Sequence, residues 1–326
     1  MTHQFTHSSI RLPMRLKHFL LPALLLLIAS TALASEALPE ARPAPVSIID
    51  DLGRTIVLQR PATRIIALYG AFNEILAEMG KEDTIIARTK ADALPPSILA
   101  KPSIGTHMRP NPELVAGLRP DIVLQLGGRK KALESVHMLE QLGIPVAFFS
   151  ITTFKELFSV IKRLGTLTNA EEQATRVCNS LQARLDLVQK QLAMVKHKPT
   201  VFFEVRYPNL LGAGDASIVN DIINHAGGIN VMDASVKLVR INEEEVIKRD
   251  PEVYLIQKGA MNPQPLPIQE RAHFRTLRAV KNNRVYIIDE SSYSRPGPRA
   301  VSAVEELAAL LHPNLMQPTS HISGDI

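Results

Sequence analysis

The sequence predicts an α/β protein of two similar βα lobes, each with a central parallel sheet, joined by a single long helix. Three observations lead to this prediction: a helix–strand unit that occurs twice, a regular alternation of short strands and helices, and one long helical segment with an apolar stripe. Strands that alternate with helices are typical of parallel βαβ construction.

The repeated unit reads NPELVAGLRPDIVLQL from Asn111 and NEEEVIKRDPEVYLIQ from Asn242, at a constant offset of 131 residues. Each copy is interpreted as an Asn cap, a short helix with Glu113 or Glu244 in its first turn, a proline that stops the helix, and a strand. We expect the two copies to occupy matching places in two lobes. The alternative is a chance recurrence of helix–strand units within one α/β fold.

Residues 1–34 have the pattern of a secretory signal peptide. Basic residues precede an apolar run at 19–29, and Ala32-Leu33-Ala34 forms a small-residue cleavage site. A retained membrane anchor is the alternative, but the apolar run is short for a bilayer. Cleavage near Ala34 predicts a soluble periplasmic protein that begins with a flexible leader at 35–45.

The N-terminal lobe is expected at 46–167. It begins with a β-hairpin whose turn contains Gly53, and strands and helices then alternate. The expected elements after the hairpin are a strand at 63–69, a helix at 73–79, strands at 84–88 and 121–126, a helix at 132–142 and a strand at 144–150.

A linking helix is expected at 168–198. Thr168 to Glu171 reads as a capping box, and apolar residues from Val177 to Val195 recur at steps of three and four. The alternative is an ordinary surface helix of one large domain. The C-terminal lobe follows at 199–313, before a disordered tail at 314–326. Its expected elements are strands at 200–206, 253–257 and 284–289 and helices at 217–225 and 300–311.

Composition and motifs argue against several function classes. The net charge is +5, and part of it belongs to the leader, so nucleic acid is not an expected partner. Cys178 is the only cysteine, which leaves no intramolecular disulfide. The sequence contains no P-loop, GxSxG or HExxH motif. We therefore predict no catalytic residues, no cofactor and no bare metal site.

Several segments together resemble the periplasmic binding proteins that serve ABC importers for cobalamin, ferric siderophores and haem. The segments that carry the resemblance are DDLGRTIVL, RIIAL, IGTHMRPNPELVAGLRPDIVL, LGIPVAFF, AGGINV, INEEEVIKRDPEV, AVKNNRVYIID and PGPRAVSAVEELAALLHP. The resemblance implies two lobes joined by one long helix, with a ligand cleft between them. It also implies that Glu113 and Glu244 dock on arginines of the membrane permease; by themselves, both are explained as solvated first-turn acids.

Ligands of open α/β sheets lie beyond the carboxyl ends of the strands. The aromatic and cationic residues at those positions are the predicted ligand-binding residues: Tyr69, Arg88, His107, Arg109, Arg129, Tyr207, Tyr293 and Arg295. Arg suits carboxylates and Tyr offers a stacking face, so a bulky anionic chelate is the expected ligand. His107 is interpreted either as a loop hydrogen-bonding residue or as a ligand of a haem iron or corrinoid cobalt.

The functional prediction is a monomeric periplasmic solute-binding protein that delivers an iron chelate of the siderophore type to an inner-membrane ABC importer. The alternatives within this class are cobalamin or another corrinoid, haem, and a small oxyanion. The absence of Trp weakens the two macrocycle alternatives. An exported enzyme on the same two-lobed scaffold is the alternative from another class, and a nucleophile next to a base in the cleft would favour it.

Overall fold

A computed structural model of the chain describes residues 44–127 and 130–314. The predicted signal peptide, most of the predicted leader and the predicted tail from residue 315 lie outside the described residues. All the described residues belong to one compact unit. The lobe boundaries given above stay a prediction, and "first lobe" and "second lobe" below denote residues 46–167 and 199–313.

The first lobe has a sheet of four parallel strands in the order β4-β3-β7-β8. Its strands are β3 (Ile65–Ala67), β4 (Ile85–Ala87), β7 (Ile122–Leu126) and β8 (Val146–Phe149). The expected hairpin is also present as β1 (Val46–Ile49) and β2 (Thr55–Leu58), with Gly53 at a positive φ of 77° in the turn. The predicted parallel construction of this lobe is therefore confirmed.

The second lobe has a mixed sheet in the order β12-β10-β9-β13-β14, and β11 also pairs with β9. Its strands are β9 (Thr200–Arg206), β10 (Leu211–Ala213), β11 (Ile229–Asn230), β12 (Leu238–Arg240), β13 (Val253–Lys258) and β14 (Val285–Asp289). β9, β13 and β14 are parallel, as expected. β10 pairs antiparallel with β9, and β12 pairs antiparallel with β10. The sequence pattern did not predict these two strands.

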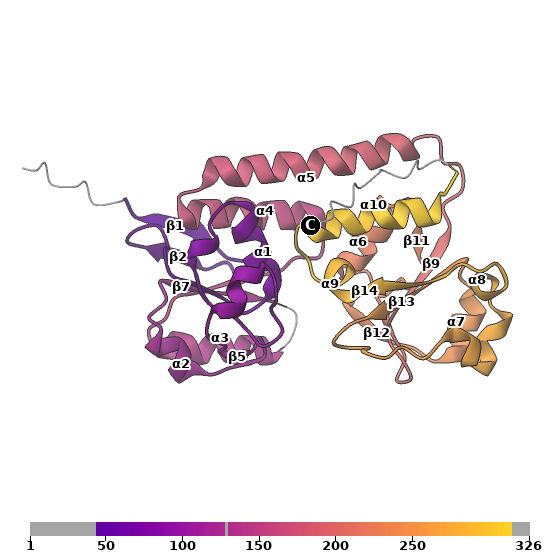
Figure 1. Cartoon of the computed structure of the whole chain (residues 1–326), viewed down its shortest axis with the longest axis horizontal. Coiled ribbons are helices and arrows are strands. Elements are labelled where there is room, and N and C mark those ends of the chain that lie inside the picture. Colours follow the sequence, from indigo (N-terminus) through magenta and orange to yellow (C-terminus); the bar gives the residue numbers. More distant parts are fainter. Residues whose placement is uncertain (1–43, 128–129, 315–326) are drawn as a thin grey trace, which may run out of the picture. The chain divides into compact units, whose positions relative to one another are not determined.

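Helices cover the sheets and connect them (Figure 1). They are α1 (Gly70–Glu78), α2 (Pro112–Gly117), α3 (Lys130–Gln141), α4 (Phe154–Thr168), α5 (Glu171–Leu192), α6 (Ile218–His225), α7 (Glu243–Arg249), α8 (Arg278–Lys281), α9 (Glu290–Tyr293) and α10 (Arg299–Leu311). α5 is the linking helix, and it packs against α4, α6 and α10.

The start of the linking helix differs from the prediction. The expected capping box at Thr168 is wrong, because Thr168 ends α4 and its hydroxyl donates to the Leu164 carbonyl at 2.8 Å. Asn169 then adopts the left-handed conformation, and α5 begins without a side-chain cap. A Cβ on Gly165 would lie 2.6 Å from the Ala174 Cβ, so α4 and α5 approach too closely there for a larger side chain. The resulting helix has 22 residues and spans about 33 Å.

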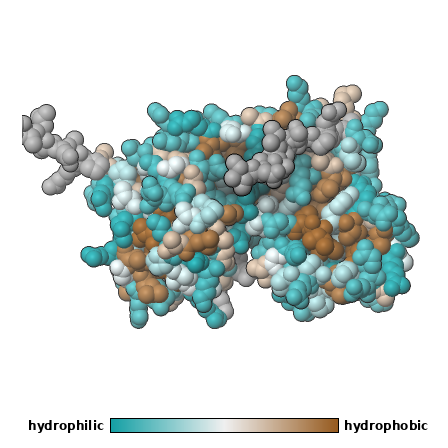
Figure 2. All heavy atoms as spheres, viewed as in Figure 1, coloured by the Kyte–Doolittle hydropathy of each residue, from teal (hydrophilic) through white to brown (hydrophobic). Residues whose placement is uncertain are grey.

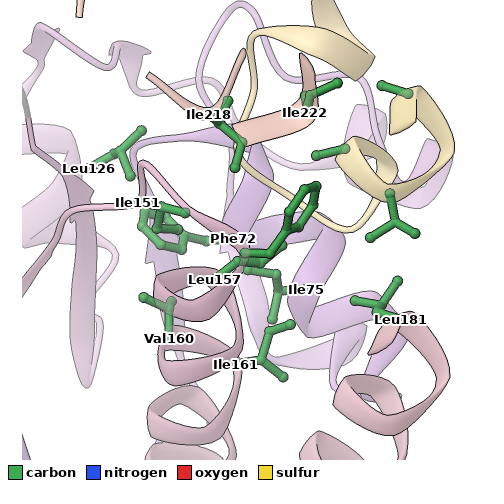
Figure 3. Close-up of a cluster of buried hydrophobic side chains, with 14 of the residues drawn as sticks. Phe72, Ile75, Leu126, Ile151, Leu157, Val160, Ile161, Leu181, Ile218 and Ile222 are labelled. Carbon is green, nitrogen blue, oxygen red and sulfur yellow. The ribbon is translucent and has the colours of Figure 1, made fainter. Parts of the chain in front are cut away.

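One apolar core runs through both lobes, and the predicted stripe of α5 forms part of it. Leu181, Leu185, Val188 and Leu192 of α5 are buried in a cluster that also contains residues of both sheets. Figure 3 shows side chains of α1, α4, α5 and α6 pointing into this cluster. Each sheet packs a smaller apolar cluster on its other face. The two lobes therefore share their main hydrophobic core.

The repeated unit forms the same structure twice, as predicted. The side chain of Asn111 accepts from the Leu114 amide at 3.0 Å, and that of Asn242 accepts from the Glu245 amide at 2.9 Å. Both helices are followed by a non-glycine residue at positive φ, Arg119 at 46° and Asp250 at 41°. These two residues occupy equivalent places in the repeat.

The acids that begin the two repeated strands also have matching roles. Asp121 accepts hydrogen bonds from the Thr63 and Arg64 amides at 2.8 and 2.9 Å, next to β3. Glu252 accepts from the Thr200 amide at 2.9 Å, at the start of β9. Burial raises the pKa of each carboxyl, but these hydrogen bonds outweigh burial, so both pKa values are lowered. Each acid therefore ties its strand to the neighbouring one.

Most of the face in Figure 2 is hydrophilic, and its hydrophobic side chains gather in separate patches. Over residues 44–127 and 130–314, none of the helices is both long and apolar enough to cross a membrane.

We predict that Leu181→Ala destabilises both lobes together. Removing this buried side chain should lower the free energy of unfolding by about 2–5 kcal/mol. Leu187→Ala on the exposed side of the same helix is the matched control and should change it by less than about 0.5 kcal/mol. Urea unfolding followed by circular dichroism and tyrosine fluorescence measures both. Two separate transitions would contradict a shared core.

We predict that Asp121→Asn reduces the loss of stability in acid. Because the folded-state pKa of Asp121 is lowered below an unfolded value of about 3.9, its carboxylate stabilises the fold above that pH. This contribution disappears as pH falls through the folded-state pKa. Urea midpoints between pH 7 and pH 2 should therefore fall less steeply in the variant than in the wild type. Asp83→Asn, at an exposed acid, is the control; parallel slopes for all three proteins would refute the role of Asp121.

Candidate ligand-binding site

A cavity of about 250 Å³ lies at the carboxyl ends of strands from both lobes. From the first lobe it is lined by Leu68, Tyr69, Gly70, Thr89, Ala91, Asp92, His107, Met108, Leu126 and Gly127. From the second it is lined by Val205, Ala213, Ser217, Ile218, Val219, Lys237, Leu238, Gln257, Ala260, Met261, Glu290, Ser294 and Arg295. The position agrees with the rule for ligand sites in open α/β sheets.

Two helices begin at this cavity. Tyr69 precedes the first residue of α1, and Ser217 precedes the first residue of α6. The Ser217 hydroxyl donates to the Gly214 carbonyl at 2.7 Å and does not cap its helix. The N-terminal ends of helices carry a partial positive charge, so both lobes present a weakly positive backbone surface to the cavity.

Asp92 is the most buried charged residue of the cavity wall, at 4% exposure. Its Oδ2 accepts from the Thr89 amide at 3.1 Å and from the Thr89 hydroxyl at 2.8 Å. Its Oδ1 lies 2.7 Å from the place where a Cβ on Gly70 would be, and Arg295 Nη1 lies 3.3 Å from the same place. A glycine at position 70 is what allows these two charged groups to approach α1.

Glu290 follows β14 directly and joins the cavity wall to a loop. Its Oε2 accepts from the Met261 amide at 2.9 Å and from the Gln257 side-chain amide at 3.2 Å. A Cβ on Gly259 would lie 2.3 Å from the Glu290 Cβ, so only glycine fits there. Gln257 in turn accepts from the Ser294 hydroxyl. These contacts fix the 259–262 loop beside α9.

Arg295 is half-buried, and its guanidinium has neither a hydrogen bond nor an ion pair among the described residues. The segment that follows it is held against the first lobe. Gly297 lies so close to α1 that a Cβ would be 3.2 Å from the Ala71 Cβ, and Arg299 forms two 2.8 Å hydrogen bonds with the Glu74 carboxylate. The backbone of Arg295 is thus anchored while its cation faces the cavity.

The structure brings Tyr69, His107 and Arg295 of the predicted ligand-binding residues to this cavity. The rings of Tyr69 and His107 meet edge to face at 5.7 Å. The Gln125 side chain, fully buried on β7, donates to the His107 carbonyl at 3.1 Å and so holds the turn between β5 (Gly105–Thr106) and β6 (Arg109–Pro110). Arg129 lies outside the described residues.

Arg88 and Arg109 are not brought to the cavity wall. Arg88 is half-buried, and its Nη1 donates to the neighbouring Thr89 carbonyl at 3.2 Å. Arg109 is exposed on β6. Each follows or borders a strand as predicted, but neither is among the residues that line the cavity.

Tyr207 belongs to a polar cluster inside the second lobe. Its hydroxyl donates to Glu243 Oε1 at 2.8 Å, which raises the pKa of the phenol. Its ring lies 3.9 Å from the guanidinium carbon of Arg271. Arg271 is paired with Glu204, and both side chains are fully buried. Tyr207 therefore contacts a buried ion pair of the second lobe, and it is not among the residues that line the cavity.

Tyr293 does not fit the predicted role, because its side chain is fully buried. It packs against Phe203 with ring centroids 6.1 Å apart. Burial and the neighbouring Glu306 raise the pKa of its phenol. Arg295, two residues later, emerges from the core and lines the cavity instead.

The wall of the cavity also contains residues that the sequence analysis did not name. Aromatic and cationic side chains do not dominate the wall, which is largely apolar and carries Asp92 and Glu290 as well as Lys237 and Arg295. The strand-end rule could have found both acids, because Asp92 lies four residues past the predicted strand 84–88 and Glu290 follows the strand 284–289. Within the described ranges, no group of three or more His, Cys, Asp or Glu residues could hold a metal ion.

A family model for periplasmic binding proteins matches residues 65–292. The chain belongs to this family. It is similar to a Bacillus subtilis ABC transporter substrate-binding lipoprotein, YvrC, with 25% identity over 285 residues, 86% of this chain and 90% of the relative. It is also similar to a vitamin B12-binding protein of Photorhabdus laumondii, with 25% identity and coverage of 77% and 88%.

Solved structures of family members have the same fold. CeuE of Helicobacter pylori in a Ni-His complex superposes with a TM-score of 0.71 at 24% identity, covering 85% of this chain and 91% of that one. The haem-binding protein RhuT of Roseiflexus superposes with a TM-score of 0.68 at 20% identity, covering 77% and 98%. Periplasmic binding proteins of this family are ligand-binding components of transport systems and work outside the cytoplasm.

Proposed function

We propose that this protein captures a metal complex, such as a ferric siderophore, in the cavity and delivers it to an ABC importer of the inner membrane. The observation that carries the proposal is Arg295. An unpaired, half-buried guanidinium in a mostly apolar cavity is the arrangement expected where a ligand supplies the missing acceptor. Relatives and structural neighbours named for vitamin B12, haem and iron binding support a metal complex.

A corrinoid is the second candidate, because curated relatives are named vitamin B12-binding proteins. Small-molecule sites usually enclose about 300–1,000 Å³. The cavity of about 250 Å³ lies below that range and therefore favours a smaller complex or a partly enclosed one.

The Thr89 hydroxyl of the cavity wall donates to the Asp92 carboxylate at 2.8 Å, whereas the two serines of the wall form no such pair and to that extent favour binding over catalysis. The Ser217 hydroxyl donates to a backbone carbonyl, and the Ser294 hydroxyl donates to the Gln257 amide oxygen. Neither hydroxyl donates to a base. A nucleophilic serine needs a base that accepts its proton.

Glu113 and Glu244 are the proposed contacts with the permease. Both are exposed, and each lies in the first turn of its helix at a matching place in the repeat. On α7 the two flanking acids are already engaged, Glu243 with Tyr207 and Glu245 with Arg249. Glu244 remains without a hydrogen bond or ion pair in the described part of the chain, as does Glu113. The same proposal includes cleavage of the signal peptide near Ala34. The mature protein then acts as a soluble monomer.

We predict that Arg295→Gln weakens binding of the ligand about tenfold to hundredfold, because a charge-assisted hydrogen bond contributes about 1.5–3 kcal/mol. Arg109→Gln, at an exposed arginine outside the cavity, is the matched control and should bind as the wild type does. Protein isolated from the periplasm of its host is first characterised by visible spectrum and metal analysis. Calorimetric titration with the complex so identified then compares the three proteins. Equal affinities would remove Arg295 from the site.

We predict that Glu113→Ala and Glu244→Ala spare ligand binding and impair uptake. Two contacts on one body reinforce each other, so the double variant should lose more uptake than either single variant. The control is the double variant Glu134→Ala/Glu270→Ala, at exposed acids elsewhere in the two lobes. Uptake of the bound complex into cells that lack the native protein is the measurement. Full uptake with the Glu113/Glu244 double variant would show that the repeat is only architectural.

A further inference from the structure

We propose that Asp92 and Glu290 form an acidic pair that selects a ligand carrying hydrogen-bond donors or positive charge and rejects a polyanionic one. The proposal rests on the binding function proposed above and names the chemical class of its ligand: a metal complex that is uncharged, zwitterionic or cationic and bears amide, amine or hydroxyl groups. One member of the pair comes from each lobe.

The first support is the geometry of Asp92. The two hydrogen bonds from Thr89 both go to Oδ2, and Oδ1 has no hydrogen-bond partner among the described residues. The residue as a whole is only 4% exposed, and it lines the cavity. Oδ1 is not among the fully buried atoms that lack a partner, so it keeps some exposed surface and a hydrogen-bond donor of a ligand in the cavity can reach it.

Glu290 repeats this arrangement from the second lobe. Its Oε2 accepts from the Met261 amide and the Gln257 side chain, and its Oε1 has no partner within the described ranges. Gly259 allows the loop to approach this side chain closely. In each acid, one carboxylate oxygen accepts the hydrogen bonds that hold the side chain in place. The other oxygen accepts no hydrogen bond from the described residues.

The structural contacts do not require a negative charge. The carbonyl oxygen of an Asn or Gln side chain could accept the same two hydrogen bonds that Oδ2 of Asp92 or Oε2 of Glu290 accepts. An Asn or Gln would differ in two respects: it would carry no negative charge, and its second atom would be a donor NH₂ group instead of an acceptor oxygen. Holding Thr89 or the 259–262 loop requires neither the charge nor the second acceptor oxygen. A ligand in the cavity is the group that meets this second atom.

The charge balance of the cavity sets the limit on the ligand. Two cations line the cavity: Lys237 has an interaction partner, whereas Arg295 has no hydrogen bond or ion pair in the described part of the chain and can neutralise one anionic group of a ligand. Further anionic groups would face Asp92 or Glu290 in an apolar surrounding, where like charges repel strongly. A triply anionic complex is therefore disfavoured, and one with a single acceptor for Arg295 and donors for the acids is favoured.

Equilibrium dialysis with three probes tests the proposal: a neutral ferric trihydroxamate, cyanocobalamin and a triply anionic ferric tricatecholate. The wild type should bind at least one of the two uncharged probes at least tenfold more tightly than the tricatecholate. Asp92→Asn and Glu290→Gln keep the size of each side chain and turn the free acceptor into a donor. Each should weaken binding of the uncharged probe about tenfold to hundredfold and reduce the discrimination against the trianion.

Asp83→Asn, at an exposed acid of the first lobe, is the control and should leave both affinities unchanged. Thermal unfolding of each variant checks folding, and the wild-type preference tests the proposal even if one variant does not fold. Equal or tighter binding of the tricatecholate by the wild type would overturn the acidic pair and leave the proposed function intact. Binding of none of the three probes would overturn the proposed function and this inference with it.

Discussion

The rest of the structure depends on the apolar core that the two lobes share across α5. Phe72 of α1, Leu181 of α5 and Ile222 of α6 belong to one buried cluster (Figure 3). Separating the lobes would expose this surface to water. Burying one aliphatic side chain completely stabilises the folded state by about 1.5–3 kcal/mol. The core therefore fixes α1 and α6, whose N-terminal ends reach the ligand cavity.

Polar contacts between distant segments set the finer geometry of the cavity. The Arg299–Glu74 pair and the close contact of Gly297 with Ala71 hold the segment after Arg295 against α1. The Asp221 side chain on α6 accepts from the Phe154 amide at 2.7 Å, which ties the start of α4 to the second lobe. Preorganised side chains lose less freedom when a ligand binds, so these contacts favour affinity as well as stability.

The charged residues of the second lobe divide into those that serve the fold and those that remain available to a ligand. Glu204 and Arg271 pair in the interior and draw Tyr207 into their cluster. Arg295 and the free oxygens of Asp92 and Glu290 stay at the cavity. The wall of the cavity accordingly has few charged residues, two acidic and two basic: Asp92, Glu290, Lys237 and Arg295.

Features that depend on neighbours in the chain were determined by the sequence itself. The caps at Asn111 and Asn242, the stripe along α5 and the parallel strands of both lobes follow from local patterns of polarity and turn chemistry. Only the tertiary structure decided that Thr168 ends α4 and that the linking helix begins at Glu171, after Asn169 in the left-handed conformation. It also decided which strand-end side chains face the cavity: Tyr293 packs into the core, whereas Asp92 and Glu290 line the wall. The direction of a side chain past the end of a strand is set by packing against other segments of the folded chain, and residue type alone carries no record of that packing.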